Sequence, residues 1–234
     1  MVEAGAMIGA KAGARSEARV GLKLEAERKR MAEILKVLKR EYPESQCSLV
    51  YKTPFQLLIA TILSAQCTDE RVNQVTPELF RNFPGPQEMA EAKIRELEKL
   101  VQTTGFFRSK AKSLLETSQA IVKQHGGKVP MELDQLIKLR GVGRNTANVV
   151  LGVAFGVPGL VVDTHVKRLS NRMGFTRSSD PVKIEQELMK LVSKEDWSLY
   201  AHLLIDHGRA ICTARKAKCE ECVISRFCPR VGVG

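Results

Sequence analysis

The sequence has no apolar run near the ~18 residues that a membrane-spanning helix needs, which argues against a membrane protein. Its N-terminus lacks the charged-then-apolar pattern of a secretory signal, and four of its six cysteines are crowded at one end. These features argue against a secreted disulfide framework and favour an intracellular protein of the cytoplasm or nucleoid. Organelle targeting by residues 1–22 stays open, although Glu3 and Glu17 weaken it.

Acidic residues are too few to balance the basic ones. The chain has 26 Asp and Glu against 37 Lys and Arg, and its formal net charge is +11 at pH 7. Such a surplus predicts a polyanionic partner, and nucleic acid is favoured over a membrane because no lipid-facing segment accompanies it. The alternative is a soluble protein that is basic without a polyanionic partner.

Alternation of apolar and polar residues, the pattern of a strand, is sustained nowhere, and no internal repeat of 20–50 residues is present. Apolar residues instead recur at spacings of three and four, as at positions 31, 34, 35 and 38. The expected helices are 25–42, 53–66, 70–83, 87–101, 108–124, 132–139, 144–155, 164–173, 181–193 and 197–210. Thr53 as N-cap and Pro54 at the first helical position begin the second of them. The fold class is all-α, and residues 1–22 are predicted to be a flexible basic tail.

Four cysteines with the spacing C-x6-C-x2-C-x5-C lie within 17 residues: Cys212, Cys219, Cys222 and Cys228. Four thiolates this close together can surround one metal centre. Only Cys219 and Cys222 have the tight spacing of structural zinc sites, whereas a four-iron cluster, being wider than one ion, tolerates the longer outer gaps. The spacing therefore predicts a metal centre and favours an iron–sulfur cluster, with zinc left open. Cys47 and Cys67 are expected to be ordinary half-buried thiols.

The segment that carries these cysteines is itself basic. Its cations are Arg209, Arg215, Lys216, Lys218, Arg226 and Arg230, against the acids Glu220 and Glu221. A loop held by a metal centre can present cations such as Arg215 and Lys216 to phosphates in a fixed geometry. The alternative is that these charges only keep the surface soluble.

The segment LRGVGRNTANVV, residues 139–150, places Gly141, Val142 and Gly143 between two expected helices. Glycines let the backbone approach a ligand closely, and a helix begins with N–H groups that have no partner within the helix. Those amides and the helix dipole favour an anion, here a DNA phosphate, and the carbonyls of such a turn can hold a monovalent cation. A tight turn with no ligand is the alternative.

Asp163 lies twenty residues after Gly143, behind the apolar run 160–162 and before Thr164, which can begin the next helix. A carboxylate in this place is either a helix cap or a group in a cleft facing DNA. The sequence alone leaves both interpretations open.

Taken together, the Gly-Val-Gly hairpin, the aspartate 20 residues later and the C-terminal cysteine spacing resemble the endonuclease III family of DNA repair glycosylases. The segments LLIATILSAQCTDERVN and TTGFFRSKAKSL reinforce the resemblance, which covers about residues 30–230. It implies two helical domains with a DNA-binding cleft between them. The domains expected are 46–158, with six helices and the helix–hairpin–helix, and 23–45 plus 159–234, with a [4Fe–4S] cluster. The implied partner is double-stranded DNA with a damaged pyrimidine, bound by a monomer.

The resemblance also implies roles for single residues. Asp163 corresponds to the catalytic carboxylate, Gln66 to the residue that fills the gap left by a flipped nucleotide, and Phe106 to an apolar wedge facing the opposite strand. Without the resemblance, Gln66 would be interpreted as a helix end and Phe106 as a core residue. The hairpin residues expected to contact DNA are Gly141, Val142, Gly143, Arg144 and Thr146. Arg140 replaces the proline that the family usually has, which is expected to loosen the turn slightly and to offer a phosphate contact.

Asn145 stands where bifunctional members of the family have a lysine. That amine attacks C1′ of the sugar, displaces the base and forms an imine that permits strand cleavage. An amide nitrogen is delocalised into its carbonyl and cannot do this. The sequence therefore predicts a DNA glycosylase for oxidised pyrimidines whose AP-lyase activity is lost or strongly reduced.

Three alternatives remain. A monofunctional enzyme can use Asp163 to activate water, as adenine-mismatch relatives do, although those usually carry a further recognition domain. A bifunctional enzyme can have had its lysine replaced, naturally or by design. A non-catalytic damage-binding or redox-sensing iron–sulfur protein is the rival from another class, and Asp163 and Gln66 argue against it.

Overall fold

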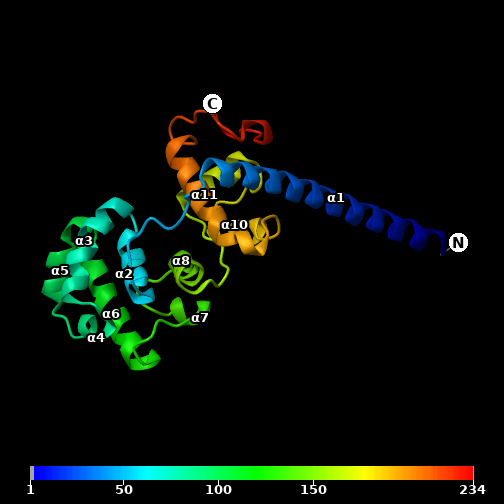
Figure 1. Ribbon diagram of the computed structural model, residues 1–234. Helices are drawn as coiled ribbons and strands as arrows, with labels where there is room; N and C mark the ends of the chain where they lie inside the picture. Colours follow the sequence, from blue (N-terminus) through cyan, green and yellow to red (C-terminus); the bar gives the residue numbers. More distant parts are fainter. Residues whose placement is uncertain (1–2, 234) are drawn as a thin grey trace. The chain divides into compact units, whose positions relative to one another are not determined.

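The computed structural model describes the backbone of residues 3–233 and the side chains of residues 21–233. Its secondary structure is helical (Figure 1). The helices are α1 (Glu3–Glu41), α2 (Pro54–Ser64), α3 (Asp69–Asn82), α4 (Pro86–Ala90), α5 (Ile94–Val101), η1 (Gln102–Thr104), α6 (Phe107–His125), α7 (Leu133–Leu136), α8 (Arg144–Phe155), α9 (Thr164–Arg172), α10 (Pro181–Leu188), η2 (Lys194–Asp196), α11 (Trp197–Ala210) and η3 (Ser225–Phe227). Over the described backbone no strand is present, and the one isolated β-bridge pairs Cys212 with Ala217. The all-α prediction is confirmed. Within the described residues, no helix is long and apolar enough to cross a membrane.

Two predicted segments differ from the structure. The helix expected at 87–101 is two helices, α4 and α5, separated by the extended backbone of Lys93 (φ −73°, ψ 131°), and this break lets both Met89 and Leu97 be buried. Most of the tail expected at 1–22 instead belongs to α1, which runs from Glu3. Its alanines favour a helix and no proline precedes position 43. The side chains of residues 1–20 lie outside the described residues.

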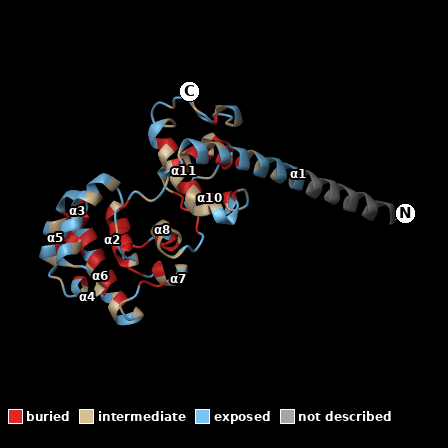
Figure 2. Cartoon of the chain, viewed as in Figure 1, coloured by how far each residue is buried: buried red, intermediate tan, exposed pale blue. Residues whose placement is uncertain are grey.

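The chain divides into two compact units, residues 46–161 and residues 1–45 with 162–234. In the first unit, α2 is the central helix: every residue from Phe55 to Leu63 is buried, as its red colour in Figure 2 shows. The Thr53 side chain accepts a hydrogen bond from the Gln56 amide, and Pro54 follows it, so the predicted start of this helix is confirmed. Helices α3, α6 and α8 all contact α2.

The second unit is built on the apolar stripe of α1, in which Met31, Ile34 and Leu38 are fully buried. Helices α9 and α11 pack closely at Gly208, where an added Cβ would lie 2.6 Å from His165 Nδ1. Arg30 fixes α1 to this unit, because its Nη1 donates at 2.9 Å to the carbonyl oxygens of both Met173 and Phe227. Arg30 thereby also ties the C-terminal loop to α1 at Phe227.

Candidate functional site

The glycine hairpin joins α7 to α8 through residues 141–143. Gly141 has φ +75°, and a Cβ there would lie 2.8 Å from Ser113, so only glycine fits without a shift of its neighbour. Val142 is 5% exposed and anchors the turn in the core. The Thr117 hydroxyl donates to the Arg140 carbonyl at 2.7 Å and fixes the chain on entry to the turn. The hairpin is therefore held rigidly on α6.

The N-terminus of α8 follows directly. Gly143 is its N-cap and supplies no side-chain cap, so the first amides of this 12-residue helix have no side-chain acceptor from that position. Arg144 is exposed, whereas Asn145 and Thr146 are half-buried in the first turn. The positive end of a helix dipole favours an anion. Asn145 lies in the first turn of this helix.

Glu116 competes with the phosphate that Arg140 is expected to bind. Its guanidinium lies 3.4 Å from a carboxylate oxygen of Glu116, in an exposed ion pair that also includes Lys112. An exposed pair of this kind contributes little to stability, about 0–1 kcal/mol, and a phosphate can displace it.

Gln66 and Phe106 both adopt left-handed backbone conformations, with φ of 53° and 45°. Gln66 is exposed beyond the end of α2, which agrees with its interpretation as a helix end. Phe106 is 69% exposed, so the interpretation of this residue as core is wrong. Non-glycine residues rarely adopt this backbone conformation, and strained residues of this kind cluster at functional sites. Both belong to the unit 46–161.

Asp163 caps α9. Its Oδ1 accepts a hydrogen bond of 2.8 Å from the Val166 amide, and the residue is half-buried. The cap uses one of the two carboxylate oxygens and fixes the direction in which the group points. His165 nearby has its pKa lowered by burial, although the charge of Asp163 opposes that shift. Asp163 belongs to the unit of residues 1–45 and 162–234, and Asn145 to the unit 46–161.

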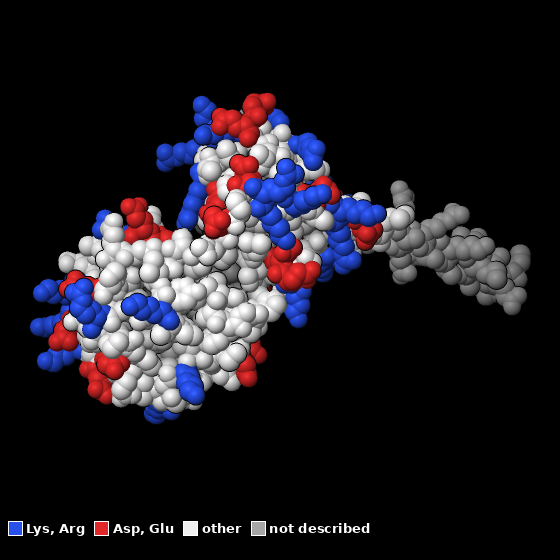
Figure 3. Space-filling view, in the orientation of Figure 1, with Lys and Arg blue, Asp and Glu red and all other residues white. Residues whose placement is uncertain are grey.

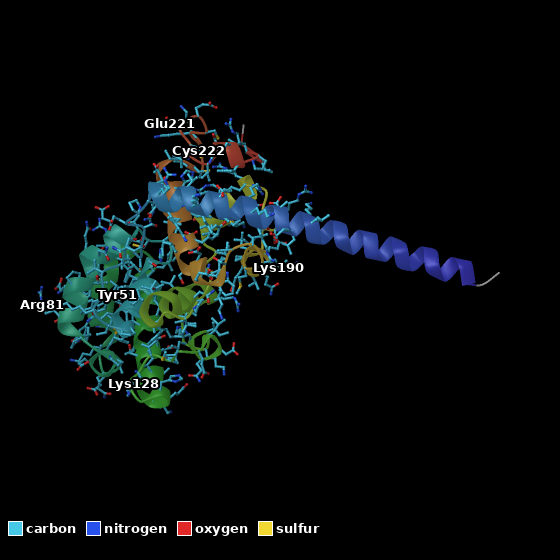
Figure 4. All side chains as sticks on the ribbon, turned by 45° about the vertical axis from the view of Figure 1, so that its right-hand side comes forward. Tyr51, Arg81, Lys128, Lys190, Glu221 and Cys222 are labelled. Atoms are coloured by element: carbon cyan, nitrogen blue, oxygen red, sulfur yellow. The ribbon has the colours of Figure 1, made fainter. Side chains whose placement is uncertain are left out.

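The four clustered cysteines surround one cavity, which is also lined by Arg172 and His207. Cys222 is labelled in Figure 4, in the loop after α11. Arg172 Nη1 donates to Cys212 Sγ at 3.2 Å and to the Thr213 carbonyl at 2.8 Å. These contacts order the loop around its sulfur atoms.

The donor set fits a metal centre made for thiolates. Burial raises the pKa of the Cys222 and Cys228 thiols, and the other sulfurs add to both shifts. Only a strongly positive centre favours deprotonation of thiols in such a place. Among the described residues, no three His, Cys, Asp or Glu side chains are arranged to hold a single metal ion. The four cysteine side chains line the same cavity.

Four of the basic residues of this segment divide into two kinds. Lys218 and Arg230 face the acids Glu221 and Glu220, at 3.9 and 3.3 Å. Arg215 and Lys216 are exposed at the bend of the loop. Figure 3 shows Lys and Arg interspersed with Asp and Glu on the part of this face formed by α1 and the C-terminal segment.

No local pattern in the sequence indicates Lys110, Arg172 or His207, which the structure places beside predicted site residues, or Tyr42, which is hydrogen-bonded to His207. Each acts on a partner distant in sequence, as His207 does on Tyr42 across 165 residues. No local pattern encodes such a pairing. Cys47 and Cys67 are half-buried, as expected.

Comparisons with known proteins match this arrangement. Residues 59–194 match the HhH-GPD superfamily base excision DNA repair protein family. An endonuclease III of Synechocystis sp. is 51% identical over 208 residues, which are 88% of this chain and 95% of that protein. The solved structure of a non-covalent endonuclease III–DNA complex has a TM-score of 0.83 and 40% identity, covering 87% of this chain and 95% of that one.

A second solved structure, a trapped endonuclease III–DNA covalent intermediate, has the same TM-score of 0.83 and 41% identity, and covers 87% of this chain and 96% of that one. The identity and the coverage together extend over both units of the fold. The chain belongs to the HhH-GPD superfamily of base excision DNA repair proteins and, within it, to the endonuclease III family.

Proposed function

We propose that this protein is a DNA glycosylase that removes oxidised pyrimidines from duplex DNA and leaves the strand uncut. The observation that carries the proposal is Asn145 in the first turn of α8, directly behind the hairpin, where the family has its lyase lysine. The amide of Asn145 can bind and orient but cannot attack C1′, so the reaction stops after base removal.

Asp163 supplies the remaining chemistry. Its carboxylate is held by the Val166 amide and can stabilise positive charge at the sugar carbon as the base departs. The same group can take a proton from the water that attacks C1′. The glycosidic bond breaks, the base leaves with its bonding electrons, and the water oxygen takes its place on the sugar.

DNA is bound through its phosphates and opened by two side chains. The hairpin residues Gly141, Gly143 and Thr146 are proposed to cradle a phosphate at the N-terminus of α8, with a monovalent cation on the hairpin carbonyls. Arg215 and Lys216 are proposed to bind further phosphates. Gln66 and the exposed Phe106 enter the duplex, which offsets the few kcal/mol that unstacking costs.

Cys212, Cys219, Cys222 and Cys228 are proposed to hold a [4Fe–4S] cluster. When bound, the cluster would cross-link the loop through its four cysteines and would be redox-active. In this chain, Arg172 and His207 orient two of the ligating sulfurs, and the loop between Cys212 and Cys219 presents Arg215 and Lys216.

The experiment is a single-turnover assay on a duplex with one thymine glycol, an oxidised pyrimidine, divided into two samples. One sample is analysed directly, and the other is first treated with a hydrolytic AP endonuclease, which cuts abasic sites. We expect strand breaks only in the treated sample. Breaks in the untreated sample would show that lyase activity is retained. Breaks in neither sample, with tight binding of the damaged duplex, would make the protein a damage binder.

A further inference from the structure

Lys110 is a buried lysine in the first turn of α6, only 6% exposed. Its Nζ donates to the Leu63 carbonyl at 2.8 Å and to the Thr104 carbonyl at 2.6 Å. A buried ammonium group is costly unless its protons are paired, and burial accordingly lowers its pKa. The function proposed above gives no role to this group.

The two carbonyls belong to the loops that carry Gln66 and Phe106. Leu63 lies in the last turn of α2, where helix carbonyls have no intrahelical partner, and Gln66 follows three residues later. Thr104 ends η1, and Phe106 follows two residues later. The backbone amide of Lys110 also donates to the Phe106 carbonyl at 3.0 Å. One residue thus holds both loops.

The two loops share an unusual backbone. In the described part of the chain only three non-glycine residues have positive φ, and Gln66 and Phe106 are two of them. A left-handed Gln or Phe costs free energy and persists only where its surroundings enforce it. The hydrogen bonds of Lys110 to Leu63 and Thr104 anchor the chain on the N-terminal side of both strained positions.

We propose that Lys110 is a positioning residue that fixes the Gln66 loop against the Phe106 loop, so that both side chains enter the duplex with a set spacing. The inference rests on the function proposed above, in which these two side chains open the DNA. Lys110 itself touches neither DNA nor the reacting atoms. Lys110 holds the two loops in one arrangement before DNA binds. Without it, the conformational entropy lost on ordering both loops would make the flipped state less favourable.

The test is a double-mutant cycle read by base flipping. Lys110→Met keeps the aliphatic stem and removes the three donors, and Lys112→Met on the exposed face of the same helix is the matched control. The probe is 2-aminopurine placed beside a tetrahydrofuran abasic analogue, because its fluorescence rises when stacking is lost and no chemistry is needed. The same variants are made in a Gln66→Ala/Phe106→Ala background.

We expect Lys110→Met to remove most of the fluorescence rise and to lower the single-turnover rate at saturating protein at least tenfold. Binding of undamaged duplex stays within twofold, and Lys112→Met resembles the wild type. In the background without both side chains, Lys110→Met changes the rate less than twofold. An equal loss in both backgrounds, or an undiminished fluorescence rise, would overturn the inference and reduce Lys110 to a stabilising residue.

Two arrangements keep the test decisive. If Lys110→Met does not fold, as judged by its circular dichroism, Lys110→Gln takes its place in the cycle, because its amide retains a donor. If the wild type gives neither base removal nor a fluorescence rise, the proposed function fails together with this inference. If the wild type flips and removes bases and the Lys110 variant does so equally well, only the positioning role of Lys110 is refuted.

Discussion

His207 Nε2 lies 3.3 Å from Cys222 Sγ, and on the other side of the same ring Tyr42 Oη lies 2.9 Å from Nδ1. Burial lowers the pKa of His207 to about 4, so its imidazole is neutral and carries one proton. As a ligand of the proposed cluster, Cys222 is a thiolate, which can only accept a hydrogen bond; the proton then lies on His207 Nε2, and Nδ1 accepts from the Tyr42 hydroxyl. The chain from Tyr42 to Cys222 therefore has one direction.

This direction predicts an effect on the proposed cluster. Hydrogen bonds to cluster sulfurs stabilise the more negative, reduced state, so removing the His207 donor lowers the reduction potential. We expect His207→Leu, which has no donor, to lower the midpoint potential and Tyr42→Phe to lower it less, as measured by spectroelectrochemistry. His125→Leu, in the other unit, is the control. An unchanged potential in His207→Leu would contradict the assigned proton.

Restoring the family's amine at position 145 is expected to create a lyase. In Asn145→Lys the ammonium group lies in the first turn of α8, where the positive end of the helix dipole favours its neutral, nucleophilic form. Borohydride should then trap a covalent complex with damaged duplex, and breaks should form without AP endonuclease. Asn145→Gln, which keeps an amide, should trap nothing. Borohydride trapping by the unmodified protein would show that another amine, such as Lys167, takes this role.

Asp163→Asn separates the chemistry of the carboxylate from its capping. Asparagine caps helices as well as aspartate does, so the free energy of unfolding should change by less than about 1 kcal/mol. Base removal should fall at least about a hundredfold, equivalent to about 2.7 kcal/mol of barrier, because the charge is lost. Asp180→Asn is the matched control, since Asp180 caps α10 through the Val182 and Lys183 amides. Equal activity of the two variants would leave Asp163 as a cap only.

Replacing one of the proposed cluster ligands tests the metal centre. Cys219→Ser should remove the absorbance near ~400 nm that is typical of cysteine-ligated iron, and should loosen the loop around it. The half-buried Cys47→Ser, outside the cavity, should keep both absorbance and iron. A colourless wild type that contains one zinc per chain would replace the iron–sulfur assignment.

The sequence predicts the helices well where local signals are strong. Thr53 and Pro54 begin α2 as expected, and the stripe through Met31 and Leu38 is buried as expected. It fails where the outcome depends on the partner of a helix: nothing in 87–101 encodes the break at Lys93, which tertiary packing of Met89 imposes.

The predicted site residues show the same division. Gly141 needs its glycine for a local reason, its φ of +75°, and the Gly-x-Gly pattern indicates this from sequence. Phe106 looks like a core residue because exposure is set by the surrounding fold and not by residue type. Lys110 gives no signal at all, since its two acceptors, Leu63 and Thr104, become neighbours only once α2 and η1 are packed.

The exposed cations of the cysteine loop are expected to set the salt dependence of DNA binding. Each phosphate that a Lys or Arg neutralises contributes a slope of about −0.9 to log K against log salt. Lys216→Gln should therefore weaken binding of damaged and undamaged duplex alike and reduce the slope by about one phosphate. Lys128→Gln, exposed on the other unit and labelled in Figure 4, is the control and should leave the slope unchanged. An unchanged slope in Lys216→Gln would mean that this lysine only keeps the surface soluble. Phosphate binding would then depend on the hairpin residues.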